Sequence, residues 1–452
     1  MSPLSHFGQL GGWGRLLNSA PFAGLLLMIA ILPLHSRTAH WWESWRNKIV
    51  VSVGAALAGV LLYVIPTRNV SGLAHTLTEY LAFLALIGSL YIISGGIHIR
   101  GAFAGFPYVN TAFLAIGAVL ANVLGTTGAS MLLIRPFLRA NAHRKQKQHQ
   151  VVFFIFVVSN CGGLLTPLGD PPLFLGFLRG VPFAWTLRFF PHWSLVIGLL
   201  LAIFHILDER AFLKEDLATR ENLVDEAASS AKRIHIDGRR NFVWLAGVLG
   251  TTLIAGYLLA PLLHRWCGES ASLWGSLFQA IVLGGLALVS YRTTPRWIHE
   301  SNNFHFDPVF EVAVLFFGIF GAMLPVLAIL EAVGPTLGIT KPWQYFWIAG
   351  SLSSFLDNAP TYLTFSTLAA STLGFGSSGL HALALKAPNL LAAVGCGSVF
   401  MGANTYIGNG PNFMVKAIAD HRGIKTPGFF GYMAWSALVL LPVFVIVAIV
   451  FF

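Results

Sequence analysis

Two aspartates stand inside stretches that are otherwise apolar enough to cross a membrane. Asp170 lies in Gly163-Leu-Leu-Thr-Pro-Leu-Gly-Asp-Pro-Pro172, and Asp357 lies in Leu356-Asp-Asn-Ala-Pro-Thr361. Ionisable groups at membrane depth are costly and mark ion or substrate pathways. A carboxylate in such a place can bind either Na⁺ or H⁺, and because the two compete for one group, their exchange becomes obligatory. Glycine and proline beside the carboxylate interrupt a helix and free its backbone polar groups.

The composition places these segments in a bilayer. The chain has 452 residues, of which 56% are apolar and 10% are charged, and its mean hydropathy is +0.71. Soluble domains average roughly 25% charged residues, so the chain is an integral membrane protein. The sequence pI of about 9.7 reflects basic loops that face the cytoplasm rather than a nucleic-acid partner.

Apolar runs of about 17 residues or more qualify as membrane spans. The candidates are 21–35, 49–65, 77–97, 151–180, 189–207, 241–262, 272–290, 308–330, 389–417 and 428–452. Two longer apolar stretches, 109–138 and 342–375, are interrupted midway, which predicts re-entrant hairpins. The fold class predicted is therefore an all-α integral membrane protein with about ten transmembrane helices, two re-entrant hairpins and two broken helices.

Lys and Arg test this threading. Of the 28 such residues, 21 fall in loops on one side, which the positive-inside rule makes cytoplasmic, and the other seven fall opposite. The first hairpin then opens to the cytoplasm and the second to the outside. This is the inverted-repeat plan of secondary transporters.

The stretch around Asp170 has a twin in the second half of the chain. Gly402-Ala-Asn-Thr-Tyr-Ile-Gly-Asn-Gly-Pro411 begins 239 residues after Gly163, and the hairpin tips lie 232 residues apart, from 123 to 355. The twin repeats the glycines, the threonine and the last proline, and it replaces Asp170 by Asn409. We expect the two broken spans and the two hairpin tips to enclose one site near the midplane.

The predicted division of the chain follows from these repeats. Residues 1–48 form an N-terminal segment with a first span, which the short apolar run 21–34 would also fit as a signal peptide without an evident cleavage site. Residues 49–207 are the first repeat, with hairpin 109–138 and broken span 151–180. Residues 208–262 are a cytoplasmic linker, helical in part, and a connecting span. Residues 263–452 are the second, inverted repeat, with hairpin 342–375 and broken span 389–417.

The hairpin motif at 356–361, together with Thr-Pro-Leu-Gly-Asp at 166–170 and Asn-Thr-Tyr-Ile-Gly-Asn at 404–409, resembles the ion transporter superfamily. That group includes sodium/proton antiporters of the NhaD type, citrate–metal symporters, divalent-anion/sodium symporters and arsenite permeases. The resemblance covers residues 49–452. It implies a scaffold and a transport layer, a homodimer, a multi-pass location in the bacterial inner membrane, and cation and substrate sites at the hairpin tips and helix breaks.

The candidate site residues follow from the resemblance and the repeats. Asp170 and Asp357 are the expected Na⁺ ligands, and Asp357, Asn358 and Asp170 fall where the antiporters carry their Asp-Asn and Gly-Asp pairs. The first hairpin departs from the antiporter pattern, because it reads Gly125-Thr-Thr127. The other candidates for cation or substrate binding are Asn160, Thr126, Thr127, Thr166, Gly169, Asn358, Asn404, Thr405, Gly408 and Asn409. A structural alternative stays open for Asp170, because Asp followed by Pro171 is also a helix N-cap.

The sequence predicts a transporter and not an enzyme. It carries no phosphate-binding Gly-x-x-x-x-Gly-Lys-Ser/Thr loop and no metal-ligand spacing, so an ion gradient must drive it, with no cofactor beyond the transported Na⁺ or Li⁺ and H⁺. The leading hypothesis is sodium/proton antiport by alternating access. The alternative is cation-coupled transport of citrate, a dicarboxylate or an oxyanion, with helix N-termini holding the anion. An ion channel fits the broken repeats less well.

Overall fold

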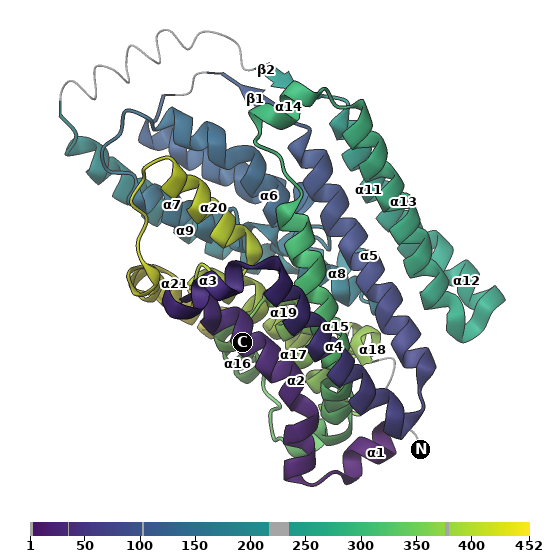
Figure 1. Ribbon diagram of the computed structural model, residues 1–452. Helices are drawn as coiled ribbons and strands as arrows, with labels where there is room; N and C mark the ends of the chain where they lie inside the picture. Colours follow the sequence, from purple (N-terminus) through teal and green to yellow (C-terminus); the bar gives the residue numbers. More distant parts are fainter. Residues whose placement is uncertain (1–2, 35, 102–103, 217–234, 376–378) are drawn as a thin grey trace.

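Helices make up nearly all of the regular structure, because a helix satisfies every backbone polar group where water is absent. The computed structural model describes residues 3–34, 36–101, 104–216, 235–375 and 379–452 (Figure 1). The helices of the first half are α1 (Pro3–Gln9), α2 (Gly12–Ile31), α3 (Ser36–Glu43), α4 (Trp45–Thr67), α5 (Val70–Gly95), α6 (Pro107–Ala140), α7 (Gln148–Val157), α8 (Pro171–Leu178) and α9 (Phe190–Leu213). The helices of the second half are α11 (Asn241–Leu253), α12 (Ala260–Cys267), α13 (Ala271–Thr293), α14 (Arg296–Ser301), α15 (Asp307–Val333), α16 (Pro342–Ser353), α17 (Asn358–Thr372), α18 (Gly379–Lys386), α19 (Pro388–Met401), α20 (Gly410–His421) and α21 (Phe429–Phe451).

The described residues contain nine helical segments that are long and apolar enough to cross a membrane, or ten if one bent pair counts as a span. They are Trp45–Thr67, Val70–Gly95, Pro107–Ala140, Gln148–Leu165, Phe183–Leu213, Asn241–Cys267, Ala271–Thr293, Asp307–Thr336 and Phe429–Phe451, and the bent pair is Gly379–Lys386 with Pro388–Asn404. The protein is therefore a multi-pass membrane protein. This confirms the predicted helical membrane class and the approximate number of spans.

Three details differ from the prediction. The first helix of appreciable length, α2, begins nine residues before the predicted span 21–35 and is not among the nine spanning segments. The linker predicted from residue 208 begins later, since α9 continues to Leu213; residues 217–234 of that linker lie outside the described part. The chain is also not purely α-helical.

Two three-residue strands, β1 (His98–Arg100) and β2 (His235–Asp237), pair antiparallel with Ile99 opposite Ile236. They join the end of α5 to the start of α11, at the top of Figure 1. A hydrogen bond from the Arg100 guanidinium lowers the pKa of the Asp237 carboxyl. Strands this short carry no hydropathy period, so the sequence could not predict them.

The long helix α6 folds back on itself. Gly125 has φ 73° and ψ 156°, a conformation that favours glycine, and it interrupts the helix at its middle. Asn110 and Asn141 exchange hydrogen bonds of 2.9 and 2.7 Å, although in a straight helix they would be about 46 Å apart at 1.5 Å per residue. Length and composition let α6 pass as one span, but these contacts show a hairpin of two limbs.

The pair α16 and α17 forms a second hairpin. The Tyr345 hydroxyl lies 3.4 Å from that of Thr372, so the start of α16 and the end of α17 are side by side. The turn between the two helices comprises residues 354–357, whereas α6 reverses at a single glycine.

Two spans are interrupted in the interior. Helix α7 ends at Val157, and α8 begins at Pro171 after an irregular stretch that includes the 3₁₀ turn η2 (Cys161–Leu165). Helix α19 ends at Met401, and α20 begins at Gly410. Residues 151–157 of α7 are each at most 2% exposed, which places this helix at the centre of the core.

Each flanking helix of the first half packs against a helix of the second half. Helix α4 lies along α15, and α13 lies along α5 (Figure 1). A Cβ atom on Gly59 of α4 would come within 2.5 Å of the Ala322 backbone of α15, so small residues permit this close approach. Large apolar side chains such as Ile281 and Leu438, which are 73% and 78% exposed, point outward, as expected for a lipid-facing surface.

Candidate functional site

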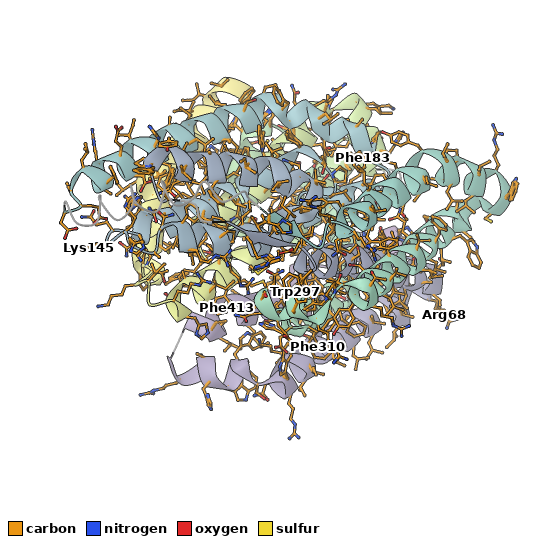
Figure 2. All side chains as sticks on the ribbon, turned by 90° about the horizontal axis from the view of Figure 1, so that it is seen from above. Arg68, Lys145, Phe183, Trp297, Phe310 and Phe413 are labelled. Atoms are coloured by element: carbon orange, nitrogen blue, oxygen red, sulfur yellow. The ribbon has the colours of Figure 1, made fainter. Side chains whose placement is uncertain are left out.

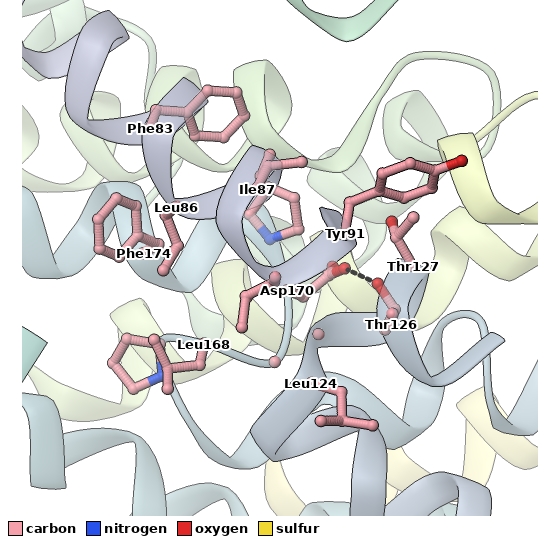
Figure 3. A pocket seen from close by; sticks show the side chains of 16 residues that line it. Phe83, Leu86, Ile87, Tyr91, Leu124, Thr126, Thr127, Leu168, Asp170 and Phe174 are labelled. Carbon is pink, nitrogen blue, oxygen red and sulfur yellow. Dashed lines mark hydrogen bonds between the residues drawn. The ribbon is translucent and has the colours of Figure 1, made fainter. Parts of the chain in front are cut away.

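Four chain segments meet at the carboxylate of Asp170. Its Oδ1 accepts hydrogen bonds from the hydroxyl of Thr126 at 3.0 Å and from the amide of Asn409 at 3.4 Å, and its Oδ2 accepts one from the amide of Asn358 at 2.8 Å. Thr126 belongs to the tip of the α6 hairpin, Asn358 to the tip of the second hairpin, and Asn409 to the second helix break. Asp170 itself is 1% exposed, and Figure 3 shows its bond to Thr126. The structure thus brings together both hairpin tips and both breaks.

Asp170 stands at the N-cap position of α8 but does not cap that helix. No side-chain hydrogen bond to the first turn is formed, because the carboxylate turns toward the hairpin tips instead. The capping alternative left open by the sequence is therefore not what the structure shows. Every described side chain that donates a hydrogen bond to this carboxylate is uncharged. None of the described residues that line the adjacent cavity is Lys or Arg.

Helix N-termini supply the electrostatic counterpart to this buried charge. The second limb of α6 and the helices α8, α17 and α20 all begin at residues that bond to Asp170 or adjoin one that does. Each helix start carries a partial positive charge of roughly half a unit. The site therefore favours a negative group without any basic side chain, and the negative group in this conformation is Asp170.

Asp357 has a different role from Asp170 in this conformation. Its carboxylate accepts a 3.1 Å hydrogen bond from the backbone N–H of Ala359 and so caps α17. Among the described residues, no hydrogen bond joins Asp357 to Asp170 or to a donor of the first repeat. The two expected Na⁺ ligands are thus neighbours through Asn358 rather than partners in one coordination shell.

Two threonines hold the helix breaks to the hairpin tips. The Thr166 hydroxyl donates to the carbonyl of Asn122 on α6, and the Thr405 hydroxyl donates to the carbonyl of Ser354 at the second tip. Each hydroxyl also accepts a backbone N–H from its own break, at 3.2 and 3.1 Å. Thr166 and Thr405 thus set the backbone frame and do not contact the Asp170 side chain.

Gly169 and Gly408 are required by close backbone approach. A Cβ atom at Gly169 would lie 2.1 Å from the carbonyl oxygen of Gly163, and one at Gly408 would lie 2.6 Å from that of Gly402. Real side chains do not tolerate such distances. The carbonyl of Gly169 in turn accepts the backbone N–H of Thr126 at 2.9 Å, which ties the first break to the first tip.

The other predicted residues form an outer layer. Asn160 accepts from Asn409 at 3.2 Å and donates to Asn412 at 2.6 Å, so it links the two breaks. Asn404 donates to the Ser354 hydroxyl and does not bond to Asp170. Thr127 lines the cavity beside Asp170 (Figure 3).

That cavity is small. It has about 30 Å³ and lies among α5, the tip of α6 and the stretch from Pro167 to Phe174. This volume suits one or two water molecules or a small cation. Its apolar wall is formed by α5 side chains, of which Phe83, Leu86, Ile87 and Tyr91 are visible in Figure 3.

The sequence did not reveal a buried polar cluster at the base of the α6 hairpin. Asp208 accepts hydrogen bonds from Asn110, Arg144, His149 and Gln150, at 2.8 to 3.0 Å, and is fully buried. This one carboxylate of α9 joins the first limb of the hairpin, the loop that follows the second limb, and α7. Arg144 is one of the 21 Lys and Arg residues that the sequence places in cytoplasmic loops, yet it is 1% exposed. The only sequence signal for its burial is Asp208, an acidic residue at the end of an apolar run that needs a cationic partner.

Comparison with known proteins places the chain in a family. The family described as "Putative citrate transport" matches residues 14–452, which is nearly the whole chain. No curated protein matches it. Within the described residues, no group of three or more His, Cys, Asp or Glu side chains is arranged to hold a metal ion.

Proposed function

The chain belongs to this citrate transport family, and from that premise we propose that it is a secondary transporter that moves a citrate-like carboxylate together with a cation. The match favours the alternative drawn from the sequence over the leading hypothesis of sodium/proton antiport. Within the site, the observation that best supports the proposal is Asp170, a buried carboxylate without a basic partner at a point where four helix starts converge.

The cation is assigned to Asp170. A carboxylate surrounded by neutral donors can take up H⁺ or Na⁺ only by changing those contacts, because Asn358 and Asn409 now present amide nitrogens to it. The Oδ1 of Asn358 is engaged by the Ser353 hydroxyl at 2.9 Å. Cation binding would therefore rearrange the hairpin tips, and this couples the ion to conformational change.

The carboxylate substrate needs another conformation. Drug-sized and metabolite-sized ligands occupy pockets of roughly 300 Å³ or more, and the cavity at Asp170 has about 30 Å³. Opening the space between the hairpin tips would expose the helix N-termini, which can hold carboxylate groups without Arg or Lys. Alternating access supplies that opening.

We further propose that the two hairpins are re-entrant and that the two repeats have opposite orientations. Figure 2 supports the re-entrant form of the first hairpin, since Lys145, which follows that hairpin, and Arg68, which precedes α5, lie at opposite ends of the molecule. A Cys267→Ser background with a single cysteine at Lys145 or Arg68 tests it. We expect a membrane-impermeant maleimide to label Arg68→Cys from outside intact cells and Lys145→Cys only after permeabilisation. Equal labelling of both from outside would refute the assignment of these two loops to opposite sides, on which the inverted plan depends.

The main test uses purified protein in proteoliposomes. We expect labelled citrate to accumulate when an inward Na⁺ or H⁺ gradient is imposed and not when the ionophore that collapses this gradient is added. Asp170→Asn should remove gradient-driven uptake while leaving a folded protein. Failure of every gradient to drive citrate uptake would refute the proposal.

Sodium/proton antiport stays as the second candidate, because the lone carboxylate suits two competing cations. Its signature is proton movement driven by Na⁺ or Li⁺ in proteoliposomes without citrate. If that movement occurs and citrate uptake does not, the ranking returns to the antiporter.

A further inference from the structure

A second cavity lies one helical turn beyond the first. It is an open cavity of about 1160 Å³ bounded by the ends of α8, α15 and α17 and the starts of α5 and α13, which the charge distribution assigns to the outside. Its lining includes the charged residues Arg179 and Glu331 and the histidines His75 and His381. We call it the Arg179 cavity. Its size is sufficient for a small organic ligand with its water.

Only one turn of α8 separates the two cavities. Phe174 lines the small cavity at Asp170, and Phe177 lines the Arg179 cavity. The two rings are stacked, with centroids 6.0 Å apart and an angle of 29°. A ligand in the Arg179 cavity is therefore next to the Asp170 site and separated from it by an aromatic pair.

The guanidinium of Arg179 is held ready for a second carboxylate. Its Nε and Nη2 donate to the two oxygens of Glu79, at 3.1 and 3.0 Å, and Glu79 is 2% exposed and does not line the cavity. This side-on pair leaves Nη1 of the guanidinium without a hydrogen-bond partner among the described residues. A guanidinium fixed by one carboxylate can bind another end-on through its remaining N–H groups.

Further groups around Arg179 suit an anion. His381 bonds through Nδ1 to the carbonyl of Gly180 at 2.8 Å, and His75 Nδ1 lies 3.6 Å from Glu79. Gln279 of α13 also lines the cavity; it is 4% exposed, and its Oε1 has no hydrogen-bond partner among the described residues. A buried acceptor without a partner is costly and indicates a ligand or water that donates to it. The hydroxyl of a hydroxycarboxylate is such a donor.

We propose that the Arg179 cavity is a binding site for a small carboxylate anion, at which the substrate is held before it reaches Asp170. The proposal rests on the proposed function for the identity of that substrate. Arg179 binds a carboxylate group of the substrate. Glu331 lines the same cavity, and its negative charge repels that carboxylate group. The two residues must therefore affect binding with opposite signs.

The experiment measures citrate binding by calorimetry to purified protein and citrate uptake by proteoliposomes. Arg179→Lys keeps a cation beside Glu79 but loses the fork, and we expect it to raise the Kd and the KM for citrate about tenfold while the maximal rate changes less than twofold. Glu331→Gln should lower both constants. Arg265→Gln, which removes an exposed cation that does not line the cavity, is the matched control and should change neither.

A second variant protects the test against misfolding. Glu79→Gln/Arg179→Gln removes both members of the ion pair, so no buried carboxylate is left unpaired, and it should weaken citrate binding more than Arg179→Lys does. If wild type transports citrate and Arg179→Lys binds it with unchanged Kd, the proposal is overturned and the proposed function stands. If Glu331→Gln weakens binding, the cavity holds a cation instead. Absence of citrate binding to wild type overturns the proposal regardless of uptake.

Discussion

The two halves of the site share a backbone frame but differ in charge. In the first half, the hydroxyl of Thr166 holds the break to the carbonyl of Asn122, and 239 residues later Thr405 makes the same bond to Ser354. The donors to the central carboxylate also correspond, since Thr126 and Asn358 lie 232 residues apart and bond to its two oxygens. The residue at the break is Asp170 in the first half and Asn409 in the second.

The comparison shows which features belong to the architecture and which to the chemistry. Threonine hydroxyls and close glycine contacts recur because both breaks must meet a hairpin tip. The carboxylate occurs once, so the site has one negative charge at its centre and one amide that donates to it. A single coupling cation is the simplest consequence. The predictions below either remove this difference between the halves or probe the frame that they share.

The largest effect is expected from Asp170→Asn, which makes the first half read like the second. A coupled cation would lose a charged ligand worth about 3 kcal/mol, or about 100-fold in affinity. Gradient-driven citrate uptake should therefore fall about 100-fold in proteoliposomes, with an unchanged gel-filtration profile.

The matched variant Asn409→Ala removes one hydrogen bond to the carboxylate and should cost only about tenfold, at about 1.5 kcal/mol. The exchange Asp170→Asn/Asn409→Asp should stay inactive, because position 409 faces the carbonyl of Ser159 at 3.2 Å. Wild-type uptake by the exchanged protein would show that the halves are interchangeable.

The shared frame predicts similar damage from Gly169→Ala and Gly408→Ala. Each new methyl group would meet a carbonyl oxygen, at 2.1 and 2.6 Å, so overpacking should lower the free energy of unfolding by about 1–3 kcal/mol, more at Gly169. Thermal unfolding in detergent measures this. Ala at Gly54, which has no atom within 4 Å of the added Cβ, is the control. An unaffected Gly408→Ala with a damaged Gly169→Ala would mean that only one break is tightly closed.

Asn122 and Ser354, whose carbonyls accept the threonine hydroxyls, differ in the contacts of their side chains. Asn122 donates to the carbonyl of Gly162 at 2.8 Å and accepts the N–H of Leu165 at 2.7 Å, whereas the Ser354 side chain contacts the break only through Asn404. Asn122→Ala should lower the free energy of unfolding by about 2 kcal/mol, because it leaves buried backbone groups unpaired, and Ser354→Ala by about 0.5–1 kcal/mol. Equal losses of the free energy of unfolding in the two variants, measured by thermal unfolding, would show that Asn122 and Ser354 stabilise their breaks to the same extent.

The sequence predicted the architecture more fully than the contacts. Apolar runs, glycine and proline placed the spans and the interruptions near Gly125, 158–170 and 405–409, since hydropathy and helix breaking are local properties. The repeats alone predicted that both breaks and both hairpin tips meet at one site. The partners of each side chain were not predicted, because Asp170 and Asp357 both precede a helix start and only tertiary packing decides which one caps it. The cluster at Asp208 was missed for the same reason, since its donors come from three separate segments.

The smallest effect is expected from Asp357→Asn, and it tests whether the second hairpin tip contributes a charge at all. In the structure, Asp357 accepts the N–H of Ala359 and is partly exposed. Asparagine caps a helix about as well as aspartate, whereas alanine does not. Asp357→Asn should therefore retain most citrate uptake, and Asp357→Ala should lose about 1 kcal/mol of the free energy of unfolding.

The opposite result would change the comparison between the halves. If Asp357→Asn abolishes uptake as completely as Asp170→Asn while the protein still unfolds at the wild-type temperature, the carboxylate of Asp357 binds an ion in another conformation. Each hairpin-and-break unit would then contribute to a site with two carboxylates, as the sequence first suggested. Only one oxygen of Asp357 accepts the capping bond from Ala359, so the other oxygen would be the ion ligand and the cap of α17 would persist during transport.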